Sequence, residues 1–301
     1  MVAAETRTST LPQAPVAVRA QPTRLEHVIK VARREKRITI FGSIIGVMVL
    51  IAIMAPVIAP YDPYATAPAS TLQQPSWAHL LGTDSLGRDQ LSRVIWGTRI
   101  SLVVAVIAVA IAFGGGVTLG LAAGYLGNWI DQVFSRFIDA MLAFPGILLA
   151  IAVTSALGPN LRNAMIAVGL IGIPLYFRLT RGQTLQAREQ EYVTAALVLG
   201  SSRARILFRH ILPNIANPMI VAASISASTA ILALAALSFI GIGPQPPEPD
   251  WGSMINSAAN LLERSPWLVF GPGLAIFLTV FSFSMLGDGL RDVLDPRLRN
   301  R

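Results

Sequence analysis

The chain has 301 residues, of which 53% are hydrophobic and only 13% are charged, and its mean hydropathy is +0.58. This composition excludes an ordinary soluble domain and indicates an all-α integral membrane protein. The net charge of +8 has to be interpreted by position, because bases beside membrane spans set orientation, and no basic patch with interleaved aromatics indicates a nucleic-acid partner.

Residues 1–37 precede the first apolar run and are expected to be a cytoplasmic tail. The first 23 residues are mostly small, polar or proline, a composition typical of disorder. Residues 24–37 then place apolar side chains at helical spacing among bases. This pattern fits either an amphipathic helix lying on membrane lipid or a solvated charged segment.

Residues 38–60 form an uncharged run of 23 residues, long enough for a first transmembrane helix. Residues 61–98 follow as a polar external loop that holds the sequence GTDSLGRD at 82–89. A phosphate or metal loop could look like this, but no second ligand cluster supports one. Leu91, Val94 and Ile95 predict a short separate amphipathic helix before the second span.

Residues 99–290 hold the remaining predicted spans. The second, about 100–126, has small residues every fourth position, which favours close helix packing; they are Ala108, Ala112, Gly116, Gly120 and Gly124. The third, about 133–157, should kink near Pro145, and the fourth covers about 161–180. Arg136 and Asp139 lie three apart on one helix face near the cytoplasmic end of their span. We expect them to pair with each other, and a role in transport is the alternative.

A polar, basic segment at 188–213 separates the fourth and fifth spans. Good helix formers cover 191–199, and Gly200 then permits a turn at positive φ. Ser201 or Ser202 can cap a second short helix that carries three arginines, and Pro213 closes the unit. Ala195, Ala196 and Leu199 are expected on one face as a small apolar surface. Such a hairpin could dock on another protein or lie among lipid headgroups.

The fifth span, about 214–243, is rich in hydroxyls. Ser224 and Ser228 could line a translocation path or bond to neighbouring helices. We place an external gate at the end of this span, with Leu237, Gly241 and Gly243, because the two glycines should leave the helix end easy to reshape. Residues 244–265 are then an external loop, 266–287 the sixth span and 291–301 a cytoplasmic tail.

The distribution of bases orients the chain. With six spans and both termini in the cytoplasm, 19 of the 24 Lys and Arg residues fall on the cytoplasmic side. The chain has no cysteine, and its only lysines precede the first span, which excludes thiolate metal sites and an ATP-binding phosphate loop. No catalytic, cofactor or metal-binding residue is predicted.

Several motifs together resemble permease subunits of ATP-binding-cassette importers, specifically the C-type subunit of the peptide/nickel family. The segment at 191–213 is similar to their cytoplasmic coupling loop, with Ala195, Ala196, Gly200 and the Leu212–Pro213 pair at the family spacing, although Thr194 replaces the family's glutamate. GTDSLGRD at 82–89, DAMLAFPGILLAI at 139–151, LSFIGIG at 237–243 and DPR at 295–297 complete the resemblance.

The resemblance implies a type I importer permease in a bacterial cytoplasmic membrane. Its partners would be a second, different permease subunit, one or two ATPase subunits that hold ATP and Mg²⁺, and an extracytoplasmic solute-binding protein. The implied ATPase-docking residues are Glu191, Thr194, Ala195, Ala196, Gly200, Ser201, Arg205, Leu212 and Pro213. Family substrates are di- and oligopeptides, glutathione and nickel chelates. A secondary carrier or channel subunit is the alternative, but neither needs a docking hairpin for an ATPase.

Overall fold

The structure is a computed structural model that describes residues 35–294. Most of the predicted surface helix at 24–37 and the end of the chain, including the DPR motif, lie outside the described residues. Within the described part, regular structure is helical apart from one isolated β-bridge between Thr83 and Asp89. The prediction of an all-α protein is therefore confirmed for this part of the chain.

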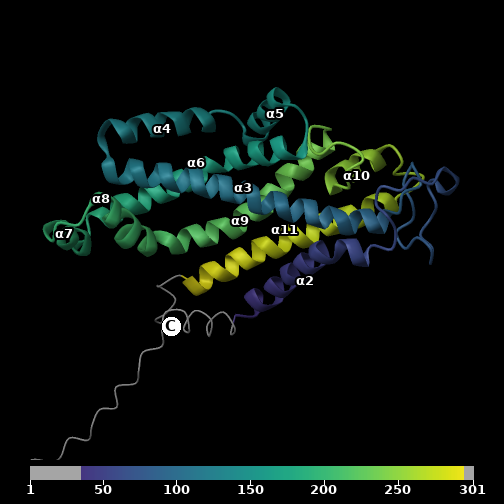
Figure 1. The fold of residues 1–301 in the computed structure, drawn as a ribbon, viewed down its shortest axis with the longest axis horizontal. Coiled ribbons are helices and arrows are strands. Elements are labelled where there is room, and N and C mark those ends of the chain that lie inside the picture. The colour runs from purple at the N-terminus through teal and green to yellow at the C-terminus, as the bar shows by residue number, and fades with distance from the viewer. Residues whose placement is uncertain (1–34, 295–301) are drawn as a thin grey trace, which may run out of the picture.

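Five long helices form the body of the molecule and run side by side (Figure 1). They are α2 (Lys36–Ile58), α3 (Gln90–Leu126), α6 (Leu161–Arg188), α9 (Leu212–Phe239) and α11 (Trp267–Leu294). Each is long and apolar enough to cross a bilayer, and a sixth span is present if the bent pair of α4 and α5 counts as one.

Helix α3 contains 37 residues, so it is about 55 Å long at 1.5 Å per residue. It begins at Gln90 because the Asp89 carboxylate accepts a hydrogen bond from the Ser92 backbone amide at 2.8 Å, an N-cap. The predicted helix at 91–95 is therefore present, but it is not a separate element before the second span. That segment is the first part of the span helix itself, extended past the bilayer.

The predicted third span is broken rather than kinked. Helices α4 (Asn128–Leu142) and α5 (Gly146–Leu157) meet at 92° around Pro145. Proline has no amide hydrogen and disfavours helical backbone at the residue before it, so the break falls at this point. Helix α6, by contrast, continues through Pro174 and reaches Arg188, two turns beyond the predicted end.

The stripe of small residues on α3 faces α6. A Cβ added at Gly116 would lie 2.5 Å from the Tyr176 Cβ, and one at Gly120 would lie 2.8 Å from the Thr180 Cβ. The two backbones therefore approach too closely for any larger residue, which is how small residues hold membrane helices together. Helix α9 packs on α3, α6 and α11, and α2 covers α3 and α11 from outside.

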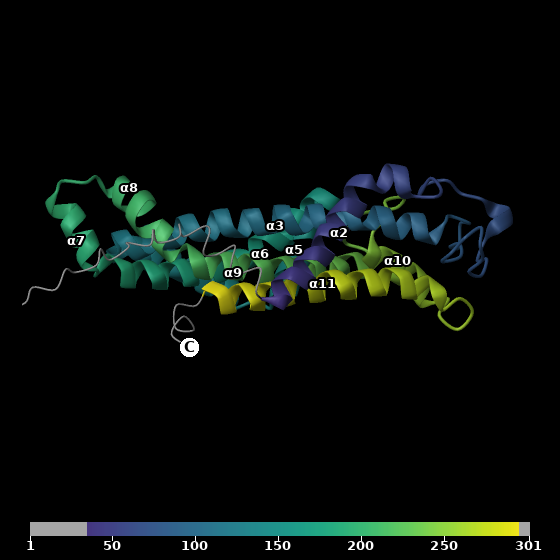
Figure 2. The same cartoon turned by 90° about the horizontal axis from the view of Figure 1, so that it is seen from below.

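The two ends of the bundle differ. At one end, α7 (Glu191–Val198) and α8 (Arg203–Arg205) project beyond the long helices, and at the other end lie the loops before α3 and the helix α10 (Trp251–Ala259) (Figure 2). The segment at 244–265 is thus not only a loop. Trp251 is buried and its indole Nε1 donates to the Val94 carbonyl at 3.0 Å, which ties α10 to α3.

Candidate functional site

The hairpin between α6 and α9 begins with α7, and its turn is fixed by backbone hydrogen bonds. The amide of Gly200 donates to Leu197 O at 2.9 Å, and the amide of Ser201 donates to Ala196 O at 3.0 Å. This pair of bonds is a Schellman motif, which requires a left-handed residue after the helix. Gly200 supplies it with φ of 73°. The sequence prediction of a glycine turn is confirmed at this residue.

The second arm of the hairpin starts at Ser202, whose hydroxyl accepts a hydrogen bond from the Arg205 amide at 3.4 Å. Of the two predicted caps, it is Ser202 that the structure uses. The arm is not a separate short helix, however. It continues from α8 through a π-helical segment, Ile206–Ile211, directly into α9, so that 203–239 form one helical rod of 37 residues. Helix α9 is assigned from Leu212, so Pro213 does lie at the start of the span helix as predicted, although no break separates it from the arm.

The inner face of the hairpin is apolar and joined to the bundle. Val193, Ile206 and Ile211 have no exposed surface, and Ala196 is 6% exposed. They belong to one buried cluster with side chains of α3, α6 and α9, including Tyr176. Because this cluster is continuous with the core, the hairpin is anchored to the span helices and displacing it requires the attached helices to follow.

The outer face carries apolar side chains that the described residues leave uncovered. Val198 is 83% exposed and Leu199 is 84% exposed. The expectation that Ala195, Ala196 and Leu199 share one face is wrong, because Ala196 points into the core whereas the other two are exposed. A sequence-only reading missed Val198, although its position beside the glycine turn is the signal that could have found it.

The other residues predicted for docking lie around this tip. Exposed side chains are Glu191, Thr194, Arg205 and Pro213, while Ser201 and Leu212 are half-buried. Gly200 is also exposed, and no atom of the described residues lies within 4 Å of a Cβ built on it. Arg203 is exposed as well and, with Tyr125 and Arg188, lines a cavity of about 380 Å³ between the hairpin and the end of α3.

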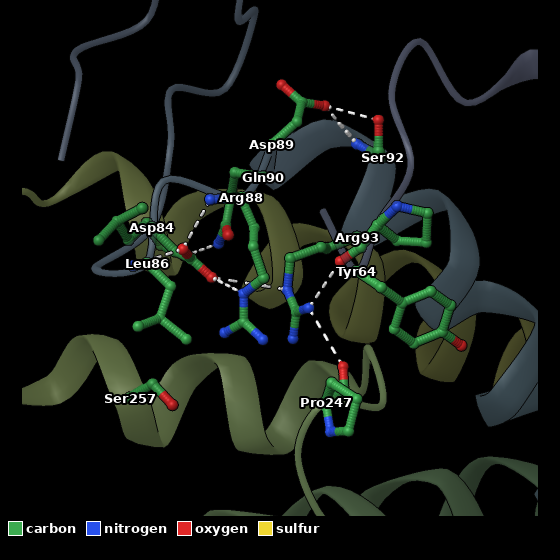
Figure 3. Close-up of polar contacts among 12 residues, drawn as sticks. Tyr64, Asp84, Leu86, Arg88, Asp89, Gln90, Ser92, Arg93, Pro247 and Ser257 are labelled. Atoms are coloured by element: carbon green, nitrogen blue, oxygen red, sulfur yellow. Dashed lines mark hydrogen bonds and ion pairs between the residues drawn. The ribbon is translucent and has the colours of Figure 1, made fainter. Parts of the chain in front are cut away.

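The GTDSLGRD segment forms a polar cluster at the opposite end of the molecule (Figure 3). The Asp84 carboxylate accepts from the Arg88 Nε at 2.7 Å, and the Arg93 Nη1 donates to Pro63 O at 2.9 Å and Pro247 O at 3.3 Å. Arg93 therefore links the loop before α3 to the loop before α10. Burying a guanidinium is tolerated only with such partners.

A buried acid completes this cluster. Asp89, besides capping α3, lies 2.9 Å from the His79 Nδ1. Gly87 has φ of 74°, and a Cβ there would collide with the Ala67 carbonyl, so the loop can close only around a glycine. Within residues 35–294 no group of three or more His, Cys, Asp or Glu is placed to hold a metal ion. The geometry of this motif indicates a structural role, in which its hydrogen bonds and ion pairs hold the loop before α3 in place.

The acid that begins α10 is also buried. Asp250 caps this helix, its carboxylate accepting from the Ser253 amide at 2.9 Å, and it is 1% exposed. Burial raises the pKa of the Asp250 carboxyl, because the ionised form loses its hydration.

The hydroxyls of α9 divide between two faces. Ser228 donates to Ile225 O at 2.7 Å and accepts from the Ser284 hydroxyl at 3.1 Å, and Ser224 faces Gly287, so both predicted path residues lie against α11. Ser226 and Thr229 instead line a cavity of about 200 Å³ between α3, α6 and α9. Periodicity alone could not separate the two faces, because hydroxyls occur on both.

The residues predicted for an external gate lie where α9 ends. Leu237 is fully buried, and Gly241, with φ of 81°, closes a second Schellman turn through its bond to Ser238 O at 3.0 Å. A Cβ on Gly243 would collide with the Ser238 hydroxyl. Gly241 lies in open space, but Gly243 is tightly packed and does not give the easily reshaped end that we expected.

The ionisable residues of α4 pair with α6 rather than with each other. Arg178 Nη2 donates to the Asp139 carboxylate at 3.0 Å, and Arg181 Nη2 donates to the Asp131 carboxylate at 2.7 Å. The predicted pair of Arg136 and Asp139 is therefore wrong. Two segments 39 residues apart in the chain supply the bond, and no local pattern could indicate that pairing.

Two family models match this chain. One, described as the inner membrane component of binding-protein-dependent transport systems, covers residues 116–300, and the other, the N-terminal TM domain of oligopeptide transport permease C, covers residues 24–75.

Curated relatives match most of the chain. A dipeptide transport system permease protein of Alkalihalophilus pseudofirmus is 46% identical over 89% of this chain and 88% of the relative. A di/tripeptide permease protein of Pseudomonas aeruginosa is 45% identical over 84% and 86%, and a glutathione permease protein of Pectobacterium atrosepticum is 44% identical over 86% and 86%.

The fold also resembles a solved one. A chain from inward-facing structures of the MetNI methionine ABC transporter superposes with a TM-score of 0.55 at 16% identity. The match covers 67% of this chain and 96% of that chain.

Proposed function

The chain belongs to the family of binding-protein-dependent transport system inner membrane components and is a permease subunit of an ATP-binding-cassette importer, and we propose that it carries peptides. Its relatives are named for dipeptides, di- and tripeptides and glutathione, all small peptides with a free ammonium and a free carboxylate. The wider family also takes nickel chelates, but the named relatives favour a peptide.

The hairpin at 191–213 is the proposed contact with the ATPase subunits. The observation that carries this assignment is the contrast between its two faces. Val193 and Ile206 anchor the inner face in the core, whereas Val198 and Leu199 expose an apolar tip beside Arg203 and Arg205. Apolar side chains that the described residues leave uncovered, with arginines beside them, suit a protein interface, because the buried core of an interface is apolar and arginine is enriched there.

The chain itself would not hydrolyse ATP. ATP and Mg²⁺ would be held by one or two separate ATPase subunits, and a second permease subunit would complete the membrane passage. An extracytoplasmic solute-binding protein would deliver the peptide. We place the complex in a bacterial cytoplasmic membrane, with six spans and both termini in the cytoplasm, on the strength of the base distribution and the apolar helices.

Motion of the hairpin would reach the far end of the molecule through one rod. The helix from Arg203 to Phe239 runs without a break from the hairpin to the turn at Gly241. ATPase closure could therefore rock this rod and reshape the external end, as a rigid-body movement.

A charge placed on the hairpin tip tests this function. Leu199→Asp should lower the amount of ATPase that co-purifies with the complex by roughly 30-fold, the effect of losing an interface anchor of about 2 kcal/mol. The matched control is Leu86→Asp, on an external loop residue that is 49% exposed, which should leave the complex intact. A Leu199→Asp complex that retains its ATPase and imports peptide at the normal rate would contradict the assignment.

A further inference from the structure

One face of α6 between residues 171 and 182 is only partly covered by the described residues. The exposed or half-exposed positions Ile171, Leu175, Arg178 and Gly182 recur at intervals of three and four, so they form one stripe on the helix. Ile171 and Leu175 of the stripe border the cavity of about 200 Å³ that Ser226 and Thr229 also line. Next to that cavity α5 packs against α6 and α9, and Ala150 of α5 belongs to a buried cluster with Leu237.

The part of the stripe nearer the hairpin contains Arg178, which forms an ion pair with Asp139. Their side chains are 61% and 55% exposed, so neither is enclosed by the part of the chain that the structure describes. A Cβ built on Gly120 of α3 would contact the Phe177 carbonyl and the Arg181 amide, so Arg178 lies at the same level of the bundle as Gly120. Gly120 is six residues before the end of α3 at Leu126, which is about 9 Å along the helix. The pair therefore lies toward the hairpin end of the span helices, where charged side chains can reach water.

The pair is not needed to hold α4 against α6. An exposed ion pair contributes little to stability, and the two-bond Asp131–Arg181 pair, whose side chains are 20% and 35% exposed, already joins the same two helices. Asp139 and Arg178 are thus available for another role. They offer an anion and a cation side by side, and both side chains are more than half exposed.

We propose that this stripe is a wall of the peptide passage and that Asp139 and Arg178 bind the two termini of the peptide as it passes. The carboxylate of Asp139 binds the terminal ammonium group of the peptide. The guanidinium of Arg178 binds its terminal carboxylate. This inference rests on the proposed function, because the peptides named for the relatives share those two groups and differ in side chains. A site that binds only the two charged termini accepts peptides with varied side chains. The neighbouring cavity is lined mainly by apolar residues, with the hydroxyls of Ser226 and Thr229 among them.

Cysteine labelling tests whether the stripe faces water, since the chain has no native cysteine. In everted vesicles holding the complete transporter, Leu175→Cys and Gly182→Cys should react with a charged thiol reagent. Ile53→Cys, on a residue of the outermost helix α2 that is 68% exposed in this chain, should not react. Failure of both stripe cysteines to react would show that lipid or the partner permease covers the stripe, and would overturn the proposal.

Protection by peptides then tests the ligand. Dialanine should slow labelling of Gly182→Cys, whereas N-acetyl-dialanine amide, which lacks both charges, should not. Adding Asp139→Asn or Arg178→Gln should weaken the protection by about tenfold, the effect of losing one charge-assisted hydrogen bond. Asp62→Asn, at an exposed acid of the loop before α3, is the control and should keep it. Equal protection by the blocked peptide, or no loss in the two variants, would overturn the proposal.

The same vesicle preparations separate this inference from the proposed function. Import of dialanine by right-side-out vesicles of the unsubstituted complex with its binding protein, driven by ATP, reports on the function alone. If import occurs but the stripe cysteines stay unlabelled, only the assignment of Asp139 and Arg178 fails. If no peptide is imported, the proposed function fails first.

Discussion

At the scale of single residues, Gly200 decides whether the hairpin can form its turn. Its φ of 73° lies in the left-handed region, and its amide and that of Ser201 close the helix end. Among the described residues no atom lies within 4 Å of a Cβ built there, so strain in the backbone and not lack of space limits substitution.

We expect Gly200→Val to displace the tip that carries Leu199, because a β-branched residue in left-handed backbone costs about 1–2 kcal/mol or more. The chain should still reach the membrane, but import should fail. Gly200→Asn is the matched control, since asparagine tolerates this conformation, and it should retain most of the import rate. Peptide uptake, with co-purification of the ATPase, measures both variants. A Gly200→Val complex that hydrolyses ATP in step with import would contradict the docking role.

The Asp250 carboxyl gives a prediction that depends on pH. Its folded-state pKa is raised above the unfolded value of about 3.9, so the native state favours the protonated form. That contribution to stability is complete below the unfolded pKa and is lost as pH rises through the folded pKa. The substitution Asp250→Asn keeps a capping oxygen without the ionisation, so this variant should gain stability relative to the original chain as pH rises from about 4.

Thermal unfolding of the purified complex in detergent at several pH values measures this difference. Asp250→Ala, which loses the cap to the Ser253 amide, should be less stable than Asp250→Asn by roughly 1 kcal/mol. If the difference in stability between the original chain and Asp250→Asn did not change with pH, the Asp250 carboxyl would have the same pKa in the folded and unfolded states.

At the scale of helices, the seam between α3 and α6 organises the bundle. Glycines at intervals of four let the α3 backbone contact Ile173 O, Phe177 O and Arg181 O. Because apolar helices gain no hydrophobic stabilisation from meeting each other in lipid, this close approach is what holds them.

The seam predicts that replacing two nearby glycines of α3 by alanine will affect stability differently. Gly116→Ala would place its methyl group 2.7 Å from Ile173 O and should lower stability by about 1–3 kcal/mol, the cost of overpacking. Gly114→Ala meets no described atom within 4 Å and should cause no loss, since alanine is the better helix former. The midpoints of thermal unfolding should therefore differ clearly between the two variants. Equal midpoints would mean that α3 does not pack on α6 through this face.

At the scale of the whole molecule, the two ends of the bundle must lie on opposite sides of the membrane. The braced loops before α3 and α10 occupy one end, and the hairpin occupies the other. Arg93 ties those two loops to each other through Pro63 O and Pro247 O, so this end of the bundle should behave as one unit.

Single cysteines check this topology. Thr71→Cys and Glu248→Cys, both at exposed positions of the loop end, should react with an impermeant thiol reagent in whole cells. Ser202→Cys and Arg291→Cys, at exposed positions of the other end, should react only after the membrane is opened. Reaction of Ser202→Cys from outside would contradict both the orientation and the contact with a cytoplasmic ATPase.

The sequence by itself determined the features that depend on neighbouring residues. Apolar runs located the span helices, because a helix in lipid must be apolar over its length. Gly200 located the hairpin turn, since few other residues adopt positive φ. The resemblance to importer permeases, based on short motifs, is confirmed by the family match.

Only the tertiary structure decided which face of each helix meets another segment. Ala195 and Ala196 are adjacent and chemically identical, yet one is exposed and the other is buried against the bundle. Asp139 bonds to Arg178 and not to Arg136, and Ser228 faces α11 whereas Thr229 faces a cavity. These outcomes depend on how distant helices pack, and packing depends on shape across the whole chain rather than on local hydrophobicity or spacing.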